Sequence, residues 1–87
     1  MSKGRSPAKI LIVDDHPLVR EGLTMRIGLH PDLHVCGEAD CEDDALVLVK
    51  EVGPDLVLVD ISLKRGHGIE LIKRIRSLYP AVKMLVI

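Results

Sequence analysis

Short apolar runs alternate along the chain with stretches that have the spacing of a helix. The apolar runs are rich in β-branched residues, and a run that is apolar on both faces suits a strand of a parallel sheet covered by helices. We expect strands, in chain order, at residues 9–14, 34–39, 56–60 and 82–87. The second run is weaker in this pattern, and we expect it nearer an edge of the sheet.

Between these runs, apolar residues recur every three or four positions, as they do on one face of a helix. The spacing predicts helices at residues 17–29, 41–52 and 68–78, with Asp40 as the N-cap of the second. The order is therefore βαβαβαβ, and strands that alternate with helices imply right-handed crossovers and a parallel α/β sheet. Residues 1–8 are expected to form a flexible lead-in.

The composition excludes several classes of protein. The 87 residues carry 12 Lys and Arg against 13 Asp and Glu, a net charge of −1, which argues against a stand-alone nucleic-acid-binding domain. No apolar run approaches the roughly 20 residues that span a bilayer, and no signal-peptide core follows the polar start. We therefore expect a cytoplasmic protein without membrane contact, in which Cys36 and Cys41 are free thiols.

Two of the expected strands run into acidic residues. The first ends at Asp14 and Asp15, and the third ends at Asp60. In a doubly wound sheet of order 2-1-3-4 the first and third strands are neighbours, and ligands bind outside their carboxyl ends. The three carboxylates would then converge, and a hard cation such as Mg²⁺ would relieve their repulsion. Each aspartate alone also fits a turn or an N-cap, but the two strands together favour a site.

These segments resemble a known family. The stretch ILIVDDHPLVREGL resembles the opening of receiver domains of bacterial two-component response regulators, and PDLVLVDISLKRGHGIELIKRIR resembles their phosphoacceptor segment. The part DDHPLVREGL is most similar to the subfamily whose receivers precede a helix-turn-helix DNA-binding domain. The resemblance covers residues 9–87 and implies a flavodoxin-like doubly wound sheet.

The resemblance implies roles for four residues. Asp60 would accept a phosphoryl group from a phosphohistidine of a sensor histidine kinase. Asp15 would ligate Mg²⁺ directly, Asp14 would act through a bound water, and the backbone carbonyl of Ser62 would be a further ligand. A receiver catalyses at most its own phosphorylation and dephosphorylation, so we do not expect a turnover enzyme. The helix at residues 17–29 would dock the kinase.

The sequence also departs from the pattern of the family. The family places a Ser or Thr after the fourth strand and a Lys at the end of a fifth, and the chain ends at Ile87, before both. Lys64 stands where a Pro is common, whereas Gly68 matches the family's glycine. We therefore expect an incomplete receiver domain at residues 9–87. Its unpaired edge at residues 81–87 would self-associate, and only a missing C-terminal domain would bind DNA.

Two other functions remain open. One is a truncated interaction or oligomerisation module without a competent switch. The other is a phosphatase that forms an aspartyl phosphate, as haloacid-dehalogenase-like enzymes do with Asp-x-Asp, although Ser62 stands in place of the second acid. Of the smaller features, His16 is expected to be an exposed N-cap residue rather than a metal ligand. Lys64 and Arg65 are expected to be solvated loop charges.

Overall fold

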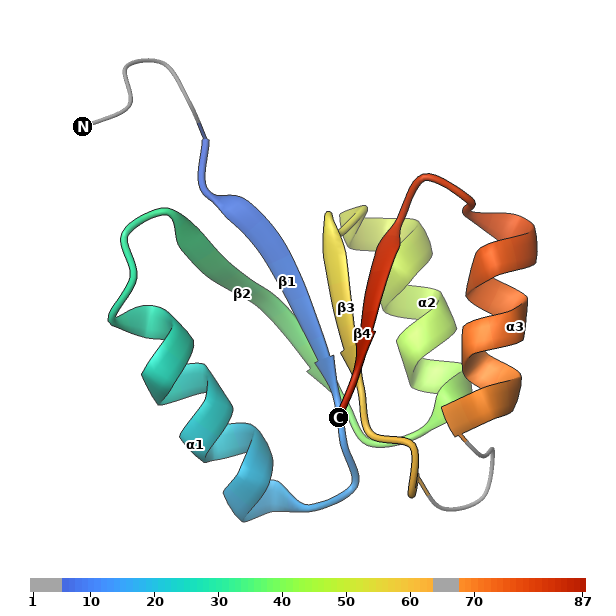
Figure 1. Ribbon diagram of the computed structural model, residues 1–87, viewed down its shortest axis with the longest axis horizontal. Helices are drawn as coiled ribbons and strands as arrows, with labels where there is room; N and C mark the ends of the chain where they lie inside the picture. Colours follow the sequence, from blue (N-terminus) through green and yellow to red (C-terminus); the bar gives the residue numbers. More distant parts are fainter. Residues whose placement is uncertain (1–5, 64–67) are drawn as a thin grey trace.

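The structure is a computed structural model that describes residues 6–63 and 68–87. Its elements follow the predicted order βαβαβαβ, and each boundary lies within one residue of the prediction (Figure 1). The elements are β1 (Ala8–Val13), α1 (Pro17–Gly28), β2 (Leu33–Ala39), α2 (Glu42–Val52), β3 (Leu56–Val59), α3 (Gly68–Leu78) and β4 (Lys83–Val86).

The four strands form one parallel sheet in the order β2-β1-β3-β4. The order 2-1-3-4 expected for a flavodoxin-like sheet is therefore confirmed, and β2 lies at an edge as predicted. At the carboxyl end of β1, Val13 pairs with Ala39 of β2 on one side and with Val59 of β3 on the other. Any residue that directly follows β1 or β3 is consequently held at the same edge of the sheet.

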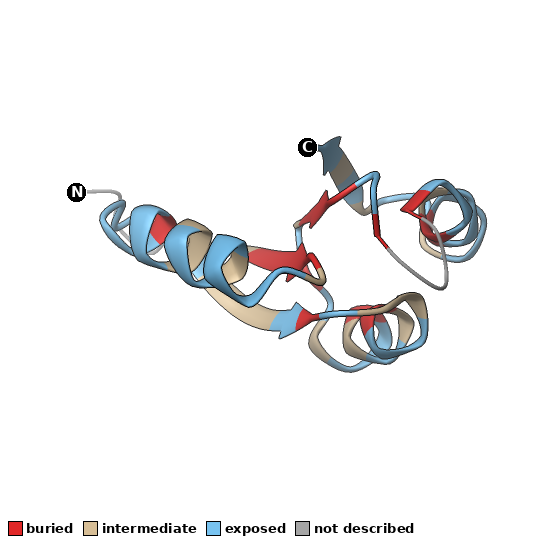
Figure 2. Cartoon of the chain, turned by 90° about the horizontal axis from the view of Figure 1, so that it is seen from below, coloured by how far each residue is buried: buried red, intermediate tan, exposed pale blue. Residues whose placement is uncertain are grey.

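Helices cover both faces of this sheet, with α1 on one side and α2 and α3 on the other (Figure 2). Successive side chains of a strand point to opposite faces, so β1 contributes to two cores. The smaller core joins Ile27 of α1 to Ile10, Ile12 and Leu58. The larger core lies under α2 and α3 and includes Leu11, Val13, Ala45, Val49, Val57, Val59, Leu71 and Ile75. The continuous apolar character of residues 10–13 in β1 and of β3 follows from this double burial.

The helix patterns predicted some details wrongly. Val19 and Leu78 stand at the apolar spacing of the helices predicted at residues 17–29 and 68–78, but they are 44% and 59% exposed. The N-cap of α2 is Cys41 rather than Asp40, and its side chain makes no capping hydrogen bond. The three acidic residues of the first turn stabilise the start of α2 instead, because they face the positive end of the helix dipole.

Cys36 and Cys41 are free thiols, as expected. Ala8 already opens β1, because its N–H donates to the carbonyl of Asp32 at 2.9 Å, so the first strand begins one residue earlier than predicted. No helix in the described part of the chain has the length and apolar character needed to cross a membrane.

Candidate functional site

Three carboxylates lie together at the carboxyl ends of β1 and β3. Asp14 and Asp60 directly follow the two strands, and the N–H of Asp60 donates to the carbonyl of Val13 at 3.0 Å. Ligand atoms of Asp14, Asp15, His16 and Asp60 all lie within 4.8 Å of one another. The structure thus brings together the three aspartates that the strand pattern singles out, and it adds a histidine.

Two of these carboxylates are buried. Asp14 is 2% exposed and Asp60 is 8% exposed, and they are the buried polar residues of the described ranges 6–63 and 68–87. A buried charge is costly unless hydrogen bonds or opposite charges compensate it. The hydrogen bonds and charges around Asp14 and Asp60 therefore decide whether these carboxyl groups are ionised.

Ser62 holds one oxygen of Asp60. Its backbone N–H and its hydroxyl donate to Oδ1 of Asp60 at 2.9 and 2.8 Å. Burial by itself would raise the pKa of Asp60, but these two hydrogen bonds, a hydrogen bond with Asp14 and the charge of His16 together hold that pKa below its ordinary value of 3.8. Asp60 is thus an ionised carboxylate at neutral pH. Oδ2 of Asp60 faces the ring of His16 instead of Ser62, at 3.4 Å from Nδ1.

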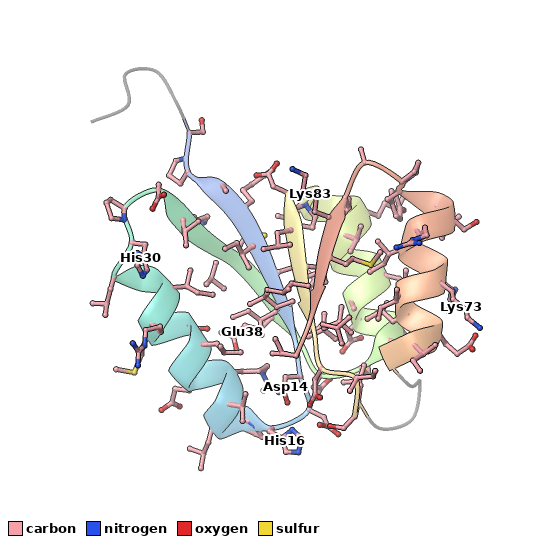
Figure 3. All side chains as sticks on the ribbon, viewed as in Figure 1. Asp14, His16, His30, Glu38, Lys73 and Lys83 are labelled. Carbon is pink, nitrogen blue, oxygen red and sulfur yellow. The ribbon has the colours of Figure 1, made fainter. Side chains whose placement is uncertain are left out.

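His16 occupies the position before α1 that the sequence predicts, and its side chain is 52% exposed. Its ring nevertheless contacts the carboxylates, with Nδ1 at 2.6 Å from Oδ1 of Asp14 and 3.1 Å from Oδ1 of Asp15. The hydrogen bond to Asp14 and the charges of the aspartates raise the pKa of His16 above 6.5. Figure 3 shows Asp14 and His16 together in the turn that leads into α1.

Gly68 allows the first residue of α3 to pack directly on the backbone of Asp60 and Ile61. A Cβ atom at this position would lie 2.5 Å from the carbonyl oxygen of Asp60 and 2.9 Å from Cα of Ile61. The glycine that the sequence singled out therefore sits where no side chain fits. Lys64 and Arg65, which were expected to be solvated loop charges, lie outside the described residues.

The donor atoms of this cluster fit a hard divalent cation. Three carboxylates supply the oxygen ligands that Mg²⁺ prefers, and their mutual repulsion favours a cation among them. Sequence reasoning missed two kinds of residue here. The prediction of His16 as an exposed N-cap residue is confirmed, but the contact of its ring with the carboxylates was not predicted, although its position beside the acidic pair was a signal. The sequence also did not single out Arg20, which donates to the backbone carbonyl of Asp14. Nothing in the residues around Arg20 indicates this contact.

A doubly wound parallel sheet with an acidic cluster at its switch point defines a flavodoxin-like α/β domain with a candidate cation site. The chain belongs to the response regulator receiver domain family, which matches residues 10–87. The resemblance of its sequence to receiver domains is therefore confirmed.

The relatives of the chain are longer response regulators. Over 79 residues it is 39% identical to response regulator GacA of Pseudomonas aeruginosa, covering 91% of this chain and 37% of that protein. Over 79 residues it is 38% identical to the DNA-binding transcriptional activator DevR/DosR of Mycobacterium tuberculosis, covering 91% of this chain and 36% of that protein. The chain thus spans about a third of these relatives and corresponds to their receiver part.

Solved structures agree with this assignment. A LuxR-family two-component response regulator from Aurantimonas superimposes with a TM-score of 0.87 at 40% identity, covering 93% of this chain and 58% of that chain. The response regulator domain of CheB from Thermotoga maritima superimposes with a TM-score of 0.86 at 30% identity, covering 92% and 59%. The flavodoxin-like receiver fold is therefore shown by the topology and by these structures.

Proposed function

We propose that this chain is the phosphoryl-accepting receiver of a two-component transcriptional response regulator. Asp60 accepts the phosphoryl group from a phosphohistidine of a sensor histidine kinase, with Mg²⁺ as the cofactor. The observation that carries the proposal is the environment of Asp60, a buried, ionised carboxylate at a strand end among Asp14, Asp15 and His16. Membership of the receiver domain family supports it.

The chemistry follows from the two oxygens of Asp60. Oδ1 accepts both hydrogen bonds from Ser62, so we assign Oδ2 as the nucleophile. A bond forms between Oδ2 and the phosphorus atom while the N–P bond of the phosphohistidine breaks, and the electron pair of that bond stays on the kinase imidazole. Because the pKa of Asp60 is lowered, no proton has to leave the carboxyl group before attack.

The same carboxylates would hold the metal. Asp15 would bind Mg²⁺ directly and Asp14 through a water, and Asp60 and the backbone carbonyl of Ser62 would be the further protein ligands. A bound Mg²⁺ neutralises negative charge on the phosphoryl group that is being transferred. The chain's own part is positioning, since Ser62 orients Asp60 and His16 orients Asp14.

Intact-mass spectrometry after incubation with a small acyl phosphate and Mg²⁺ tests the proposal. The wild-type chain should gain one phosphoryl group, and Asp60→Asn should gain none. Asp43→Asn is the matched control, because Asp43 is an exposed aspartate in the first turn of α2, and it should be phosphorylated as the wild type is. An adduct on Asp60→Asn, or none on a folded wild-type chain, contradicts the proposal.

The proposal extends to cellular context. The domain would act in the cytoplasm as a signalling switch rather than as an enzyme with turnover on other substrates, catalysing at most its own phosphorylation and dephosphorylation. Contact with DNA would belong to another part of a longer protein, as in relatives named as DNA-binding regulators. The surface of α1 would dock the kinase.

A second candidate function is self-association through residues 81–87. In the 87-residue chain, β4 is an edge strand, and its apolar residues Leu85, Val86 and Ile87 are exposed. An exposed apolar edge strand pairs readily with another chain. Light scattering should show a dimer or a larger species that Leu85→Lys disperses. A wild-type monomer at high concentration would rule this candidate out.

A further inference from the structure

One arginine joins α1 to the acidic site. Nη1 of Arg20 donates to the backbone carbonyl of Asp14 at 2.6 Å, and Nε of the same side chain donates to Oε1 of Glu38 at 3.2 Å. The side chain of Arg20 is only 20% exposed. Because a guanidinium is a rigid planar fork, hydrogen bonds at two of its nitrogens fix its orientation as well as its position.

Glu38 is itself held from α1. Its second oxygen, Oε2, accepts a hydrogen bond from the hydroxyl of Thr24 at 3.2 Å. Arg20 and Thr24 are four residues apart and therefore lie on the same face of the helix. Glu38 lies on β2 directly before Ala39, and Figure 3 shows it between α1 and the sheet, close to Asp14. The three side chains thus connect α1, β2 and the end of β1.

The carbonyl that Arg20 holds belongs to the peptide unit between Asp14 and Asp15. A peptide unit is planar, so the direction of this carbonyl sets the direction in which the chain enters Asp15. On the other side of Asp14, its N–H donates to the carbonyl of Ala39 at 3.0 Å. The backbone at Asp14 is therefore held by β2 at its N–H and by Arg20 at its carbonyl. Together these hydrogen bonds restrict the directions in which the side chains of Asp14 and Asp15 point.

The charge of this arrangement also suits a cation site. Arg20 is always protonated, and an uncompensated guanidinium next to the site would repel a divalent cation. Glu38 supplies the opposite charge directly at Nε. The pair is net neutral, so it can hold the backbone of Asp14 without opposing the cation.

We propose that Arg20, held by Glu38 and Thr24, is a positioning residue that fixes the backbone of Asp14 and Asp15 for binding of the divalent cation. The inference rests on the proposed function, because the site that Arg20 positions is the proposed magnesium site. Groups that orient the direct ligands of a metal typically contribute about 10–100-fold to its affinity. Loss of Arg20 should therefore appear as weaker Mg²⁺ binding by a folded protein.

The test compares Mg²⁺ dissociation constants by calorimetry for the wild-type chain, Arg20→Ala, Arg20→Lys and Arg26→Ala, each well below its own melting temperature. Arg26 is an exposed arginine near the end of the same helix and is the matched control. Arg20→Ala should raise the dissociation constant about tenfold, and Arg26→Ala should leave it unchanged. Arg20→Lys should stay close to Arg20→Ala, because an ammonium group lacks the planar fork.

The outcomes separate this inference from the proposed function. If the wild-type chain binds no Mg²⁺, both fail. If the wild type binds Mg²⁺ and Arg20→Ala binds it within twofold of the wild type, the positioning role is refuted, even when the melting temperature falls. If Arg20→Ala does not fold, Arg20→Lys decides, and wild-type affinity in that variant overturns the inference.

Discussion

Replacing Gly68 with alanine should destabilise the domain, whereas the same replacement at Gly22 should stabilise it. A Cβ atom at Gly68 would lie 2.5 Å from the carbonyl oxygen of Asp60 and 2.9 Å from Cα of Ile61. Both are backbone atoms, which cannot rotate away as a side chain can. At Gly22, on the exposed side of α1, no atom lies within 4 Å of the added Cβ.

The two effects differ in sign. Alanine stabilises an exposed helix position relative to glycine by about 0.5–1 kcal/mol, which is the gain expected for Gly22→Ala. Overpacking at a tightly packed position costs about 1–3 kcal/mol, and a clash with rigid backbone falls at the upper end of this range. The net loss for Gly68→Ala is therefore about 2 kcal/mol, a large part of the roughly 5–10 kcal/mol that stabilises a domain of this size.

Urea unfolding followed by far-ultraviolet circular dichroism measures both changes. With a denaturant slope of about 1 kcal/mol per molar urea, the midpoint should fall by about 2 M for Gly68→Ala and rise by up to about 1 M for Gly22→Ala. A Gly68→Ala midpoint at or above that of the wild type would refute the close approach of α3 to the backbone of Asp60.

Three further results are expected. Leu71→Ala should cost about 2–5 kcal/mol of unfolding free energy in the urea assay, because Leu71 is fully buried, whereas Leu78→Ala on the same helix should cost under about 1 kcal/mol. Because the pKa of His16 is raised, its protonated ring stabilises the fold below pH 6.5, and this contribution is lost as the pH rises through the folded-state pKa. In the absence of metal, the free energy of unfolding of His16→Ala should lack this dependence on pH. The lowered pKa of Asp60 means that its ionised form stabilises the fold above pH 3.8, with loss as the pH falls through the lower folded-state pKa, a dependence that Asp60→Asn should remove.

The fold could be predicted because its central strands carry one unambiguous signal. β1 and β3 are covered by helices on both faces, so residues 10–13 and 56–59 each read as an unbroken apolar run that ends abruptly at an aspartate. The strand order then brings those ends together, so the convergence of Asp14, Asp15 and Asp60 followed from topology alone. Helix periodicity was less informative, because it shows which face is apolar but not how far the neighbouring elements extend over it. Val19 and Leu78 are exposed for this reason.

The contacts of polar side chains could not be predicted in the same way. Arg20 and Glu38 are 18 positions apart and meet only because α1 packs on β2, which no local pattern records. His16 directly follows the acidic pair, and this placement fits a residue that only precedes the helix as well as one whose ring contacts the carboxylates. The sequence therefore does not distinguish the two roles. Such contacts depend on the side-chain rotamers that packing selects, and these are settled only when the elements are assembled.

We propose that Asp60, and neither of the other two aspartates in the cluster, receives the phosphoryl group. The wild-type chain is phosphorylated with a small acyl phosphate in the presence of Mg²⁺. The aspartyl phosphate that forms on the chain is then reduced, which marks the modified residue permanently, and that residue is identified by peptide mass spectrometry. We predict one modified residue, Asp60, and none when Mg²⁺ is removed. Modification at Asp14 or Asp15 instead, or no modification of the folded chain, would show that Asp60 is not the phosphoryl acceptor.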